Sequence, residues 1–242
     1  MPPPMIAVIT GGTLAHIRPH LALCAPAYGQ VGSVIAARLR AAPALAGWEI
    51  HRIPMRMAGR PGPATRRMLA ALGCPASPET NADVAALLRG LLAAPHTRAV
   101  VMAAAICDFE PEDLVVRGED DAEEQSAAFG KSAPRLHHAR SATIALRPSE
   151  KLLTMVKAMR PDVALVSFKT TAGQSVEEMA ARASQSLRAS GSDVVLANDL
   201  HTRRNLLVYA DGSRQIAPSR RAAIALLCGT LAGRLCPPLG QE

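Results

Sequence analysis

The sequence predicts an α/β protein with a three-layer, Rossmann-like fold, in which a mostly parallel sheet has helices on both faces. Short apolar runs alternate with helical patterns along nearly the whole chain. Several of the apolar runs are continuous, which is typical of strands that are buried on both sides. The chain has 242 residues, of which 49% are hydrophobic, and this is enough for a substantial core. We therefore expect residues 1–242 to form a single domain.

Apolar or alternating segments mark the expected strands. Residues 5–10 (MIAVIT) form the first strand and end in Gly11-Gly12. Residues 98–107 (RAVVMAAAIC) are the most apolar run, so we place them at the centre of the sheet. Residues 206–216 are expected to form a hairpin around Asp211-Gly212. The other expected strands are residues 48–54, 142–146, 163–168 and 193–197.

Helical patterns lie between these strands, and two further segments are rich in loop-forming or charged residues. Residues 55–78 contain several prolines and glycines, and residues 110–130 contain most of the clustered acids, so we expect a loop with a short hairpin in the second segment. Mobile loops are expected at 55–78 and 109–140. The expected helices are residues 30–40, 80–94, 148–159, 176–189 and 219–235.

The charge balance favours anionic ligands over nucleic acid. There are 27 Lys and Arg residues against 20 Asp and Glu, a net charge of +7, which fits either a solvated Arg-rich surface or a cleft for phosphates. One Trp, two Tyr and three Phe are too few for a platform of stacked bases, and no Lys/Arg run occurs. We expect a small anionic substrate and no nucleic-acid partner.

Neither a membrane segment nor a metal-binding motif is evident. Every long apolar stretch is interrupted by Arg, Pro or His, so no transmembrane span is expected. The five cysteines are scattered without a CxxC pair, which favours a reducing, cytoplasmic location over a disulfide framework or zinc site. The neighbouring His137 and His138 would point to opposite faces of a strand, so they are not a predicted metal pair.

In parallel sheets, ligands bind beyond the carboxyl ends of the strands, so the residues that follow the strands are the candidates for chemistry. Glycines at such a position allow backbone amides to approach a phosphate, and Gly29 and Gly32 open a helix whose free amides could bind a second anion. Taken alone, each glycine pair favours a tight turn over a ligand site. Neither GxGxxG nor GxxxxGK[ST] is present, which disfavours a dinucleotide oxidoreductase and excludes a P-loop.

Four motifs in order resemble the phosphopantothenoylcysteine synthetase family, whose bacterial form is usually the carboxy-terminal half of a bifunctional coenzyme A flavoprotein. They are ITGGT (9–13), AAAICDF (103–109), SFK (167–169) and VVLANDL (194–200), and the similarity spans about residues 5–235. The resemblance implies a ligase of coenzyme A biosynthesis that uses CTP or ATP with Mg²⁺. It would activate the carboxylate of phosphopantothenate, or of a related acid, as an acyl-nucleotide that the amine of cysteine attacks. It also implies a homodimer.

The resemblance assigns roles by position. Lys131, in FGKSAPRL, matches the catalytic lysine on a flexible flap, although alone it would be an ordinary surface lysine. Asp108 is the candidate for a catalytic role and for Mg²⁺, with capping of the next turn as the structural alternative. Phe168 would lie beside the base. The implied nucleotide-binding residues are Gly11, Gly12, Thr13, Gly29, Gly32, Ala104, Asp108, Phe168, Lys169, Asn198 and Asp199.

The chain departs from the family at positions that would bind the acid. The family's Asn that holds the acyl-nucleotide is replaced by Ala25, and its Ser-Ser-Gly becomes Ala27-Tyr28-Gly29. The Glu that follows SFK-x in the family is Thr171. Ala25 and Tyr28 are thus the candidate substrate-binding positions. A second hypothesis follows from these changes, namely a catalytically degenerate member that acts as a nucleotide-binding or assembly partner.

Overall fold

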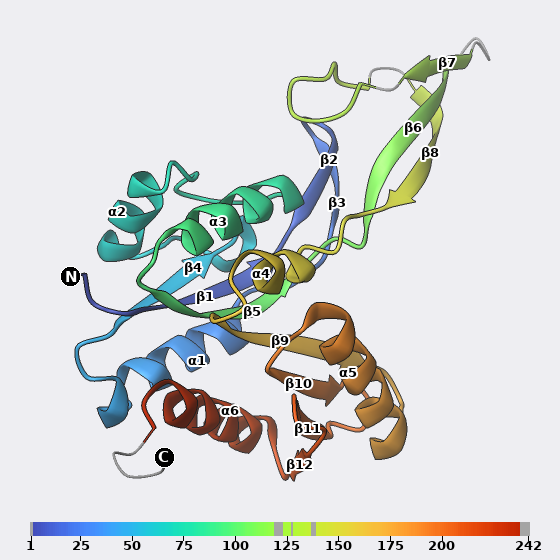
Figure 1. Ribbon diagram of the computed structural model, residues 1–242. Coiled ribbons are helices and arrows are strands. Elements are labelled where there is room, and N and C mark those ends of the chain that lie inside the picture. Colours follow the sequence, from blue (N-terminus) through green and yellow to red (C-terminus); the bar gives the residue numbers. More distant parts are fainter. Residues whose placement is uncertain (1, 119–122, 127, 137–138, 238–242) are drawn as a thin grey trace.

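The computed structural model describes residues 2–118, 123–126, 128–136 and 139–237 (Figure 1). Its main sheet has seven strands in the order β12-β11-β10-β9-β5-β1-β4. The five strands from β10 to β4 are parallel, whereas β11 runs antiparallel to β10 and β12 antiparallel to β11, so the predicted mostly parallel α/β sheet is confirmed. The strands are β1 (Met5–Gly12), β4 (Glu49–Pro54), β5 (Thr97–Ala105), β9 (Ala164–Thr171), β10 (Val194–Asp199), β11 (Asn205–Tyr209) and β12 (Arg214–Ala217).

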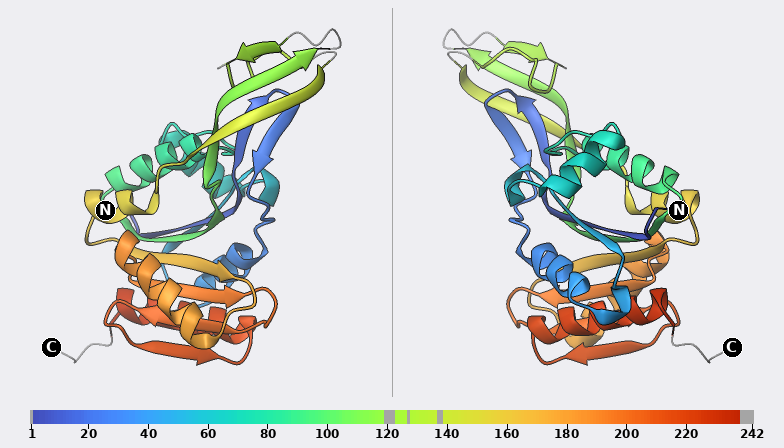
Figure 2. Two further views of the ribbon diagram at one scale, coloured as in Figure 1. Left: turned by 90° about the vertical axis from the view of Figure 1, so that its right-hand side faces the viewer. Right: turned by 90° about the vertical axis from the view of Figure 1, so that its left-hand side faces the viewer.

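Helices cover both faces of this sheet, as the sequence predicts (Figures 1 and 2). Alternate residues of each strand enter different cores: Ile6 and Val8 of β1 pack toward α1 and α6, whereas Ala7 and Ile9 pack toward α2, α3 and α4. Helix α5 covers β10 and β11 on that second side. The helices are α1 (Gln30–Arg40), α2 (Pro63–Ala71), α3 (Asn81–Ala93), α4 (Leu153–Met159), α5 (Val176–Ser190) and α6 (Arg220–Leu235).

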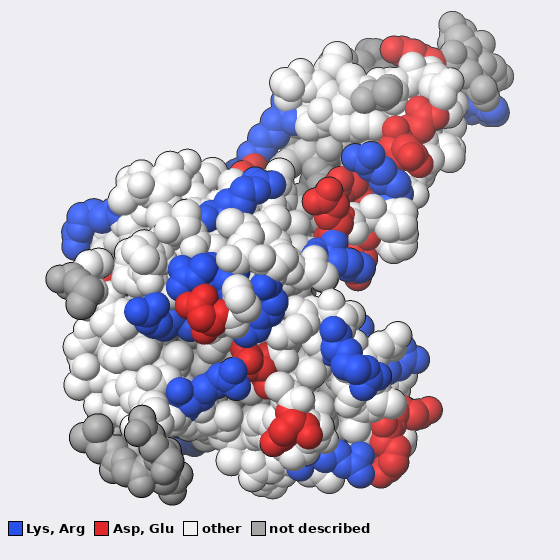
Figure 3. All heavy atoms as spheres, in the orientation of Figure 1, with Lys and Arg blue, Asp and Glu red and all other residues white. Residues whose placement is uncertain are grey.

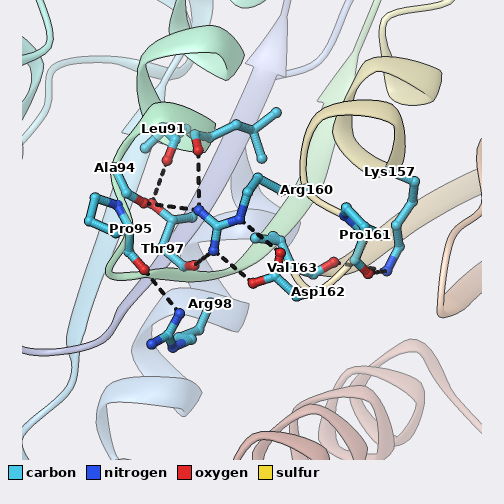
Figure 4. Close-up of polar contacts among 11 residues, drawn as sticks. Leu91, Ala94, Pro95, Thr97, Arg98, Lys157, Arg160, Pro161, Asp162 and Val163 are labelled. Atoms are coloured by element: carbon cyan, nitrogen blue, oxygen red, sulfur yellow. Dashed lines mark hydrogen bonds and ion pairs between the residues drawn. The ribbon is translucent and has the colours of Figure 1, made fainter.

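Local hydrogen bonds fix where α3 begins and ends. Thr80 and Asp83 form a capping box at its start, in which each side chain accepts a hydrogen bond from the other residue's backbone N–H. At its other end, the guanidinium of Arg160 donates to the carbonyl oxygen of Leu92 at 3.2 Å and pairs with Asp162 at 2.7 Å (Figure 4). The first turn of α3 lies at the carboxyl ends of β1 and β5, where Asn81 is hydrogen-bonded to Thr13 and Cys107.

Two small antiparallel sheets project from the carboxyl end of the main sheet and lie side by side in both views (Figures 1 and 2). The first is the hairpin of β2 (Leu14–Arg18) and β3 (Leu21–Cys24), which follows β1 directly. The second, which we call the arm, consists of β6 (Phe109–Gly118), β7 (Glu123–Ser126) and β8 (Ala139–Pro148). The backbone N–H of Ser149 donates to the carbonyl of Asp108 at 2.9 Å and closes the base of the arm.

The hairpin expected within 110–130 is present, since β6 pairs with β7, but residues 110–118 lie in the long strand β6 and not in a loop. Likewise, residues 55–78 include the helix α2 and a 3₁₀ turn, η2 (Arg56–Ala58). In the arm, Leu114 is the only described residue of β6 that is fully buried, and the residues of β8 are nearly all exposed. A strand with so little buried surface tolerates charges on both faces, which removes the alternating pattern that would reveal it.

Candidate functional site

The chain order of the parallel strands points to the gap between the carboxyl ends of β1 and β5. From β1 the chain moves outward to β4, and then returns to β5 on the other side of β1. In doubly wound sheets, ligands bind outside the strand ends at such a reversal. Gly11 pairs with Ala104 and Gly12 with Ala105 there, so the structure brings the first predicted loop and the central-strand motif together.

Close backbone packing explains the four predicted glycines. A Cβ on Gly12 would lie 1.8 Å from the carbonyl oxygen of Ala25, and one on Gly32 would lie 2.4 Å from Oγ1 of Thr10. Gly11 and Gly29 have φ values of 106° and 75°, and both lie against Ala58 of η2. The glycines therefore allow β1, η2 and the start of α1 to meet. Gly29 gives α1 no side-chain cap, and α1 has no acidic residue in its first turn.

Thr13 connects three elements at the carboxyl ends of β1 and β5. Its buried hydroxyl accepts a hydrogen bond from the backbone N–H of Cys107 at 2.8 Å and donates to Oδ1 of Asn81 at 2.7 Å. Asn81 in turn donates to the carbonyl of Cys107 at 2.9 Å. The backbone N–H of Thr13 donates to Ala105 at 3.0 Å. Thr13, which the resemblance assigns to the phosphates, thus joins β1, α3 and β5.

A cluster around Glu79, which the sequence interpretation missed, lies next to the first loop. The Nζ atom of Lys131 contacts Oε1 of Glu79, and NH1 of Arg56 donates to Oε2 at 2.8 Å. Nε2 of His16 lies 3.4 Å from Oε1, outside hydrogen-bonding geometry. Burial raises the pKa of Glu79, but the hydrogen bonds from Lys131 and Arg56 outweigh it and lower that pKa below its ordinary value. Glu79 is therefore an anion that holds two cations.

The segment that carries Lys131 is attached to β2. The backbone N–H of Gly130 donates to the carbonyl of His16 at 3.1 Å. The guanidinium of Arg18 donates to the carbonyl of Ala128, and it lies 6.0 Å from the ring centre of Phe129. The predicted flap lysine is thus placed over the strand ends by contacts from the hairpin β2–β3, and its side chain is 50% exposed.

Asp108 lies at the surface at the end of the central-strand motif. Its side chain is 74% exposed and one of its oxygens lies 3.1 Å from Nζ of Lys151. Among the residues that the structure describes, no three His, Cys, Asp or Glu side chains are grouped to hold a metal ion. Asp108 alone suits a Mg²⁺ ion whose other ligands are phosphates and water. His137 and His138 lie outside the described residues.

The remaining predicted residues lie at the carboxyl ends of β9 and β10. Phe168 and Lys169 are half-buried, and Asn198 is buried opposite Thr170. β9 pairs with β5 over only three residue pairs, from Ala99–Ala164 to Val101–Val166. Beyond that point no pairing joins the two strands, and we call these residues at the ends of β9 and β10 the second group.

Asp199 organises the loops around this second group. It is 1% exposed and accepts hydrogen bonds at 2.8–3.0 Å from Thr171, Gly173, Gln174, His201 and Thr202. Burial raises its pKa, but the backbone N–H groups of Thr202 and Gln174, with the hydroxyl of Thr171, lower it far below the ordinary value. Thr171 stands where the family has Glu, so here that position supports Asp199.

The two candidate acid-binding positions differ in accessibility. Ala25 is half-buried and lies against Gly12, whereas the Tyr28 side chain is 70% exposed and fills no interior space. Lys/Arg and Asp/Glu side chains are interspersed over the face and arm shown in Figure 3, so the net positive charge does not form one patch on this face. In the described part of the chain, no helix is long and apolar enough to cross a bilayer.

Comparison with known sequences gives one partial match. No family model matches the chain. The chain is 31% identical over 101 residues to the coenzyme A biosynthesis bifunctional protein CoaBC of Thermococcus kodakarensis. The alignment covers 42% of this chain and 21% of that protein, so the chain matches about a fifth of the relative's length.

Comparison with solved structures covers nearly the whole chain. A DNA/pantothenate metabolism flavoprotein from Streptococcus pneumoniae has a TM-score of 0.73 at 18% identity, over 96% of this chain and 99% of that one. The carboxy-terminal domain of CoaBC has a TM-score of 0.65 at 16% identity, over 96% and 95%. A Cab2 variant in complex with phosphopantothenate-cysteine has a TM-score of 0.61 at 12% identity, over 96% and 87%. The chain therefore has the fold of the CoaBC carboxy-terminal domain, which confirms its resemblance to the phosphopantothenoylcysteine synthetase family.

Proposed function

We propose that this chain is a nucleotide-dependent ligase of coenzyme A biosynthesis, which activates phosphopantothenate or a related acid and joins it to an amine such as that of cysteine. The observation that carries the proposal is the position of Lys131, whose Nζ contacts Glu79, the residue whose backbone carbonyl accepts a hydrogen bond from Leu14 just after the Gly11-Gly12 loop. The fold shared with the CoaBC carboxy-terminal domain, and with Cab2 bound to phosphopantothenate-cysteine, supports this substrate class.

In the proposed reaction, a carboxylate oxygen attacks the α-phosphate of CTP or ATP, and pyrophosphate leaves. The amine then attacks the acyl carbon and releases the nucleoside monophosphate. The ammonium of Lys131 would stabilise negative charge on the reacting phosphate, and the backbone amides at the start of α1 would bind the phosphate chain. Mg²⁺, when bound with the nucleotide, would add Lewis-acid stabilisation and would be held by Asp108.

The acid would be held by groups other than the side chain of Ala25. A methyl group supplies neither the donor nor the acceptor of an amide, so this chain lacks a contact that the family makes. Because the Tyr28 side chain points into solvent, it leaves the edge beside Gly29 accessible. We propose that the chain works in the cytoplasm as a homodimer, and that light scattering would give twice the mass of one chain.

The test is pyrophosphate release with CTP or ATP, with and without phosphopantothenate and cysteine, with mass spectrometry of the product. We expect release to require the acid and one of the two nucleotides. Lys131→Ala should lower kcat about a hundredfold or more and should also weaken nucleotide binding, because the ammonium would contact the phosphate chain in both states. Arg135→Ala removes a nearby exposed cation and serves as the control. Failure to bind either nucleotide would refute the proposal.

The second candidate is a catalytically degenerate member that binds nucleotide or assists assembly. The specific observation in its favour is that Thr171, in place of the family's Glu, donates its hydroxyl hydrogen bond to Asp199 at 2.8 Å. That residue therefore has a structural role here. Binding of CTP or ATP without pyrophosphate release, in both the natural chain and the Lys131→Ala variant, would favour this candidate.

A further inference from the structure

We propose that Arg56 and Lys131, held as a pair by Glu79, form an anion site that binds a pyrophosphate group. Arg56 belongs to none of the motifs that suggested the ligase, and Glu79 lies outside all of them. The inference rests on the proposed function for the source of the anion, which would be the nucleotide or the pyrophosphate that it releases. The site itself follows from contacts in this chain.

Glu79 provides a fixed base for the site. Its backbone carbonyl accepts a hydrogen bond from Leu14 at 2.7 Å, and its backbone N–H donates to Oδ2 of Asp83 at 2.9 Å. Its side chain is only 10% exposed. These two hydrogen bonds fix the backbone of Glu79, so its carboxylate is held directly before the first turn of α3 and next to the residue that begins β2. Asp83 accepts hydrogen bonds from the backbone of Glu79 and Thr80, so its charge serves the helix start.

The two cations bind different oxygens of this carboxylate and keep donors free for a ligand. Arg56 contacts Oε2 and Lys131 contacts Oε1, and their side chains are 60% and 50% exposed. A guanidinium has five N–H donors and an ammonium has three, so one contact with Glu79 leaves several on each cation. An anion with several oxygens could therefore accept hydrogen bonds from both cations, and the larger negative charge of a pyrophosphate favours it over a single phosphate.

The charge of the cluster favours an anion. One buried carboxylate needs one cation, whereas Glu79 has two, and the imidazole of His16 adjoins the same oxygen as Lys131. Among the described residues, the ring nitrogens of His16 have no hydrogen-bond partner, and an imidazole, neutral or protonated, adds no negative charge to the cluster. Two cations held by a single carboxylate repel each other, and a bound anion would relieve that repulsion.

The pair borders the loop where the nucleotide is expected. The backbone N–H of Arg56 donates to Pro78 at 2.8 Å, and Arg56 begins the turn whose Ala58 lies against Gly11 and Gly29. The uncapped start of α1 is thus on the same edge. Its backbone amides and the two cations would act on the same chain of phosphates.

Calorimetric titration of the full chain with inorganic pyrophosphate tests the site. We expect Arg56→Ala and Lys131→Ala each to weaken binding about tenfold or more, and the exposed Arg60→Ala control to change it by less than about twofold. Glu79→Gln should weaken binding about fivefold, because the cations lose the partner that holds them together. Inorganic phosphate should bind about tenfold more weakly than pyrophosphate, since it carries less negative charge and offers fewer oxygens to the two cations.

Several results would overturn the proposal: no pyrophosphate binding by the natural chain, an Arg56→Ala affinity within about twofold of it, or equal affinity for phosphate and pyrophosphate. Tighter binding by Glu79→Gln would show that Glu79 only competes with the anion. If a thermal melt shows that Glu79→Gln is not folded at the temperature of the titration, the affinities of Arg56→Ala and Lys131→Ala decide whether the proposal stands. Pyrophosphate binding with the expected pattern but without ligation would refute the proposed function alone, whereas ligation that is insensitive to Arg56→Ala would refute the site alone.

Discussion

The hydroxyl of Thr13 and the side-chain amide of Asn81 form a buried 2.7 Å hydrogen bond between the end of β1 and the start of α3. The same hydroxyl accepts a hydrogen bond from the backbone of Cys107, so one oxygen atom satisfies two buried groups at the edge of the sheet. The packing at this edge therefore depends on a buried side chain whose hydroxyl is bonded within the protein.

Thr13→Val should destabilise the protein by about 2 kcal/mol or more, because it leaves Oδ1 of Asn81 and the N–H of Cys107 buried without a partner. The free energy of unfolding in urea measures the effect. Thr170→Val is the matched control, since Thr170 is exposed and its hydrogen bond to Asn198 is long, at 3.4 Å. Equal stability of both variants would contradict the role assigned to Thr13.

Gly32→Ala should cost about 1–3 kcal/mol, because its Cβ would overlap Thr10 and push α1 away from β1. Gly233→Ala is the matched change within a helix. A Cβ there would meet nothing within 4 Å, and the substitution should stabilise α6 by about 0.5–1 kcal/mol. Thermal melts of the two variants should therefore shift in opposite directions, and a stabilised Gly32→Ala would contradict the packing described for α1.

Asp199 should make the protein sensitive to acid. Its pKa in the folded protein lies below the ordinary Asp value of about 3.9, so its stabilising contribution is complete above that pH and is lost as pH falls further. Asp199→Asn should lower the melting temperature at pH 7, and the difference from the natural chain should shrink below about pH 4. The exposed Glu177→Gln serves as the control. A difference that is constant from pH 7 to about pH 2 would contradict this assignment.

Arg160→Ala should destabilise the protein by about 1–2 kcal/mol, because the carbonyls at the end of α3 lose their donor. Arg98→Ala is a suitable comparison, since Arg98 is exposed and donates to the carbonyl of Pro95 at 2.9 Å (Figure 4). Its effect should stay within about 0.5 kcal/mol. If urea unfolding gave the same loss for both, the contact with α3 would not be the cause.

The main sheet could be predicted from the sequence because its strands are buried on both faces. The apolar run at 98–107 is the clearest case and corresponds to β5 (Thr97–Ala105) beside β1. The turn at Asp211-Gly212 could also be predicted from the sequence, since the hairpin requires a positive φ and Gly212 has one of 85°. In both cases a short stretch of sequence is sufficient to predict the element that it forms.

The arm and the Glu79 cluster could not be predicted in this way. β6 contacts its neighbours mainly through backbone pairing, so its side chains carry no periodic signal. Glu79 lies between Pro78 and the capping residue Thr80, and its partners Arg56 and Lys131 are distant in the sequence. The Thr80–Asp83 capping box indicates where the helix begins, but only the folded chain shows which cations reach the residue before it.

The hydrogen bond between Asp108 and Ser149 gives the arm the properties of an insertion. The chain leaves the body at one residue and returns beside it at the other, so the arm closes on itself at its base. Lengthening, shortening or exchanging the arm would not require β5 and β9 to move, because each is anchored in the core independently. The outer strands of the arm can therefore vary in length without moving the sheet, provided that the segment carrying Lys131 keeps its contacts with β2 and Glu79.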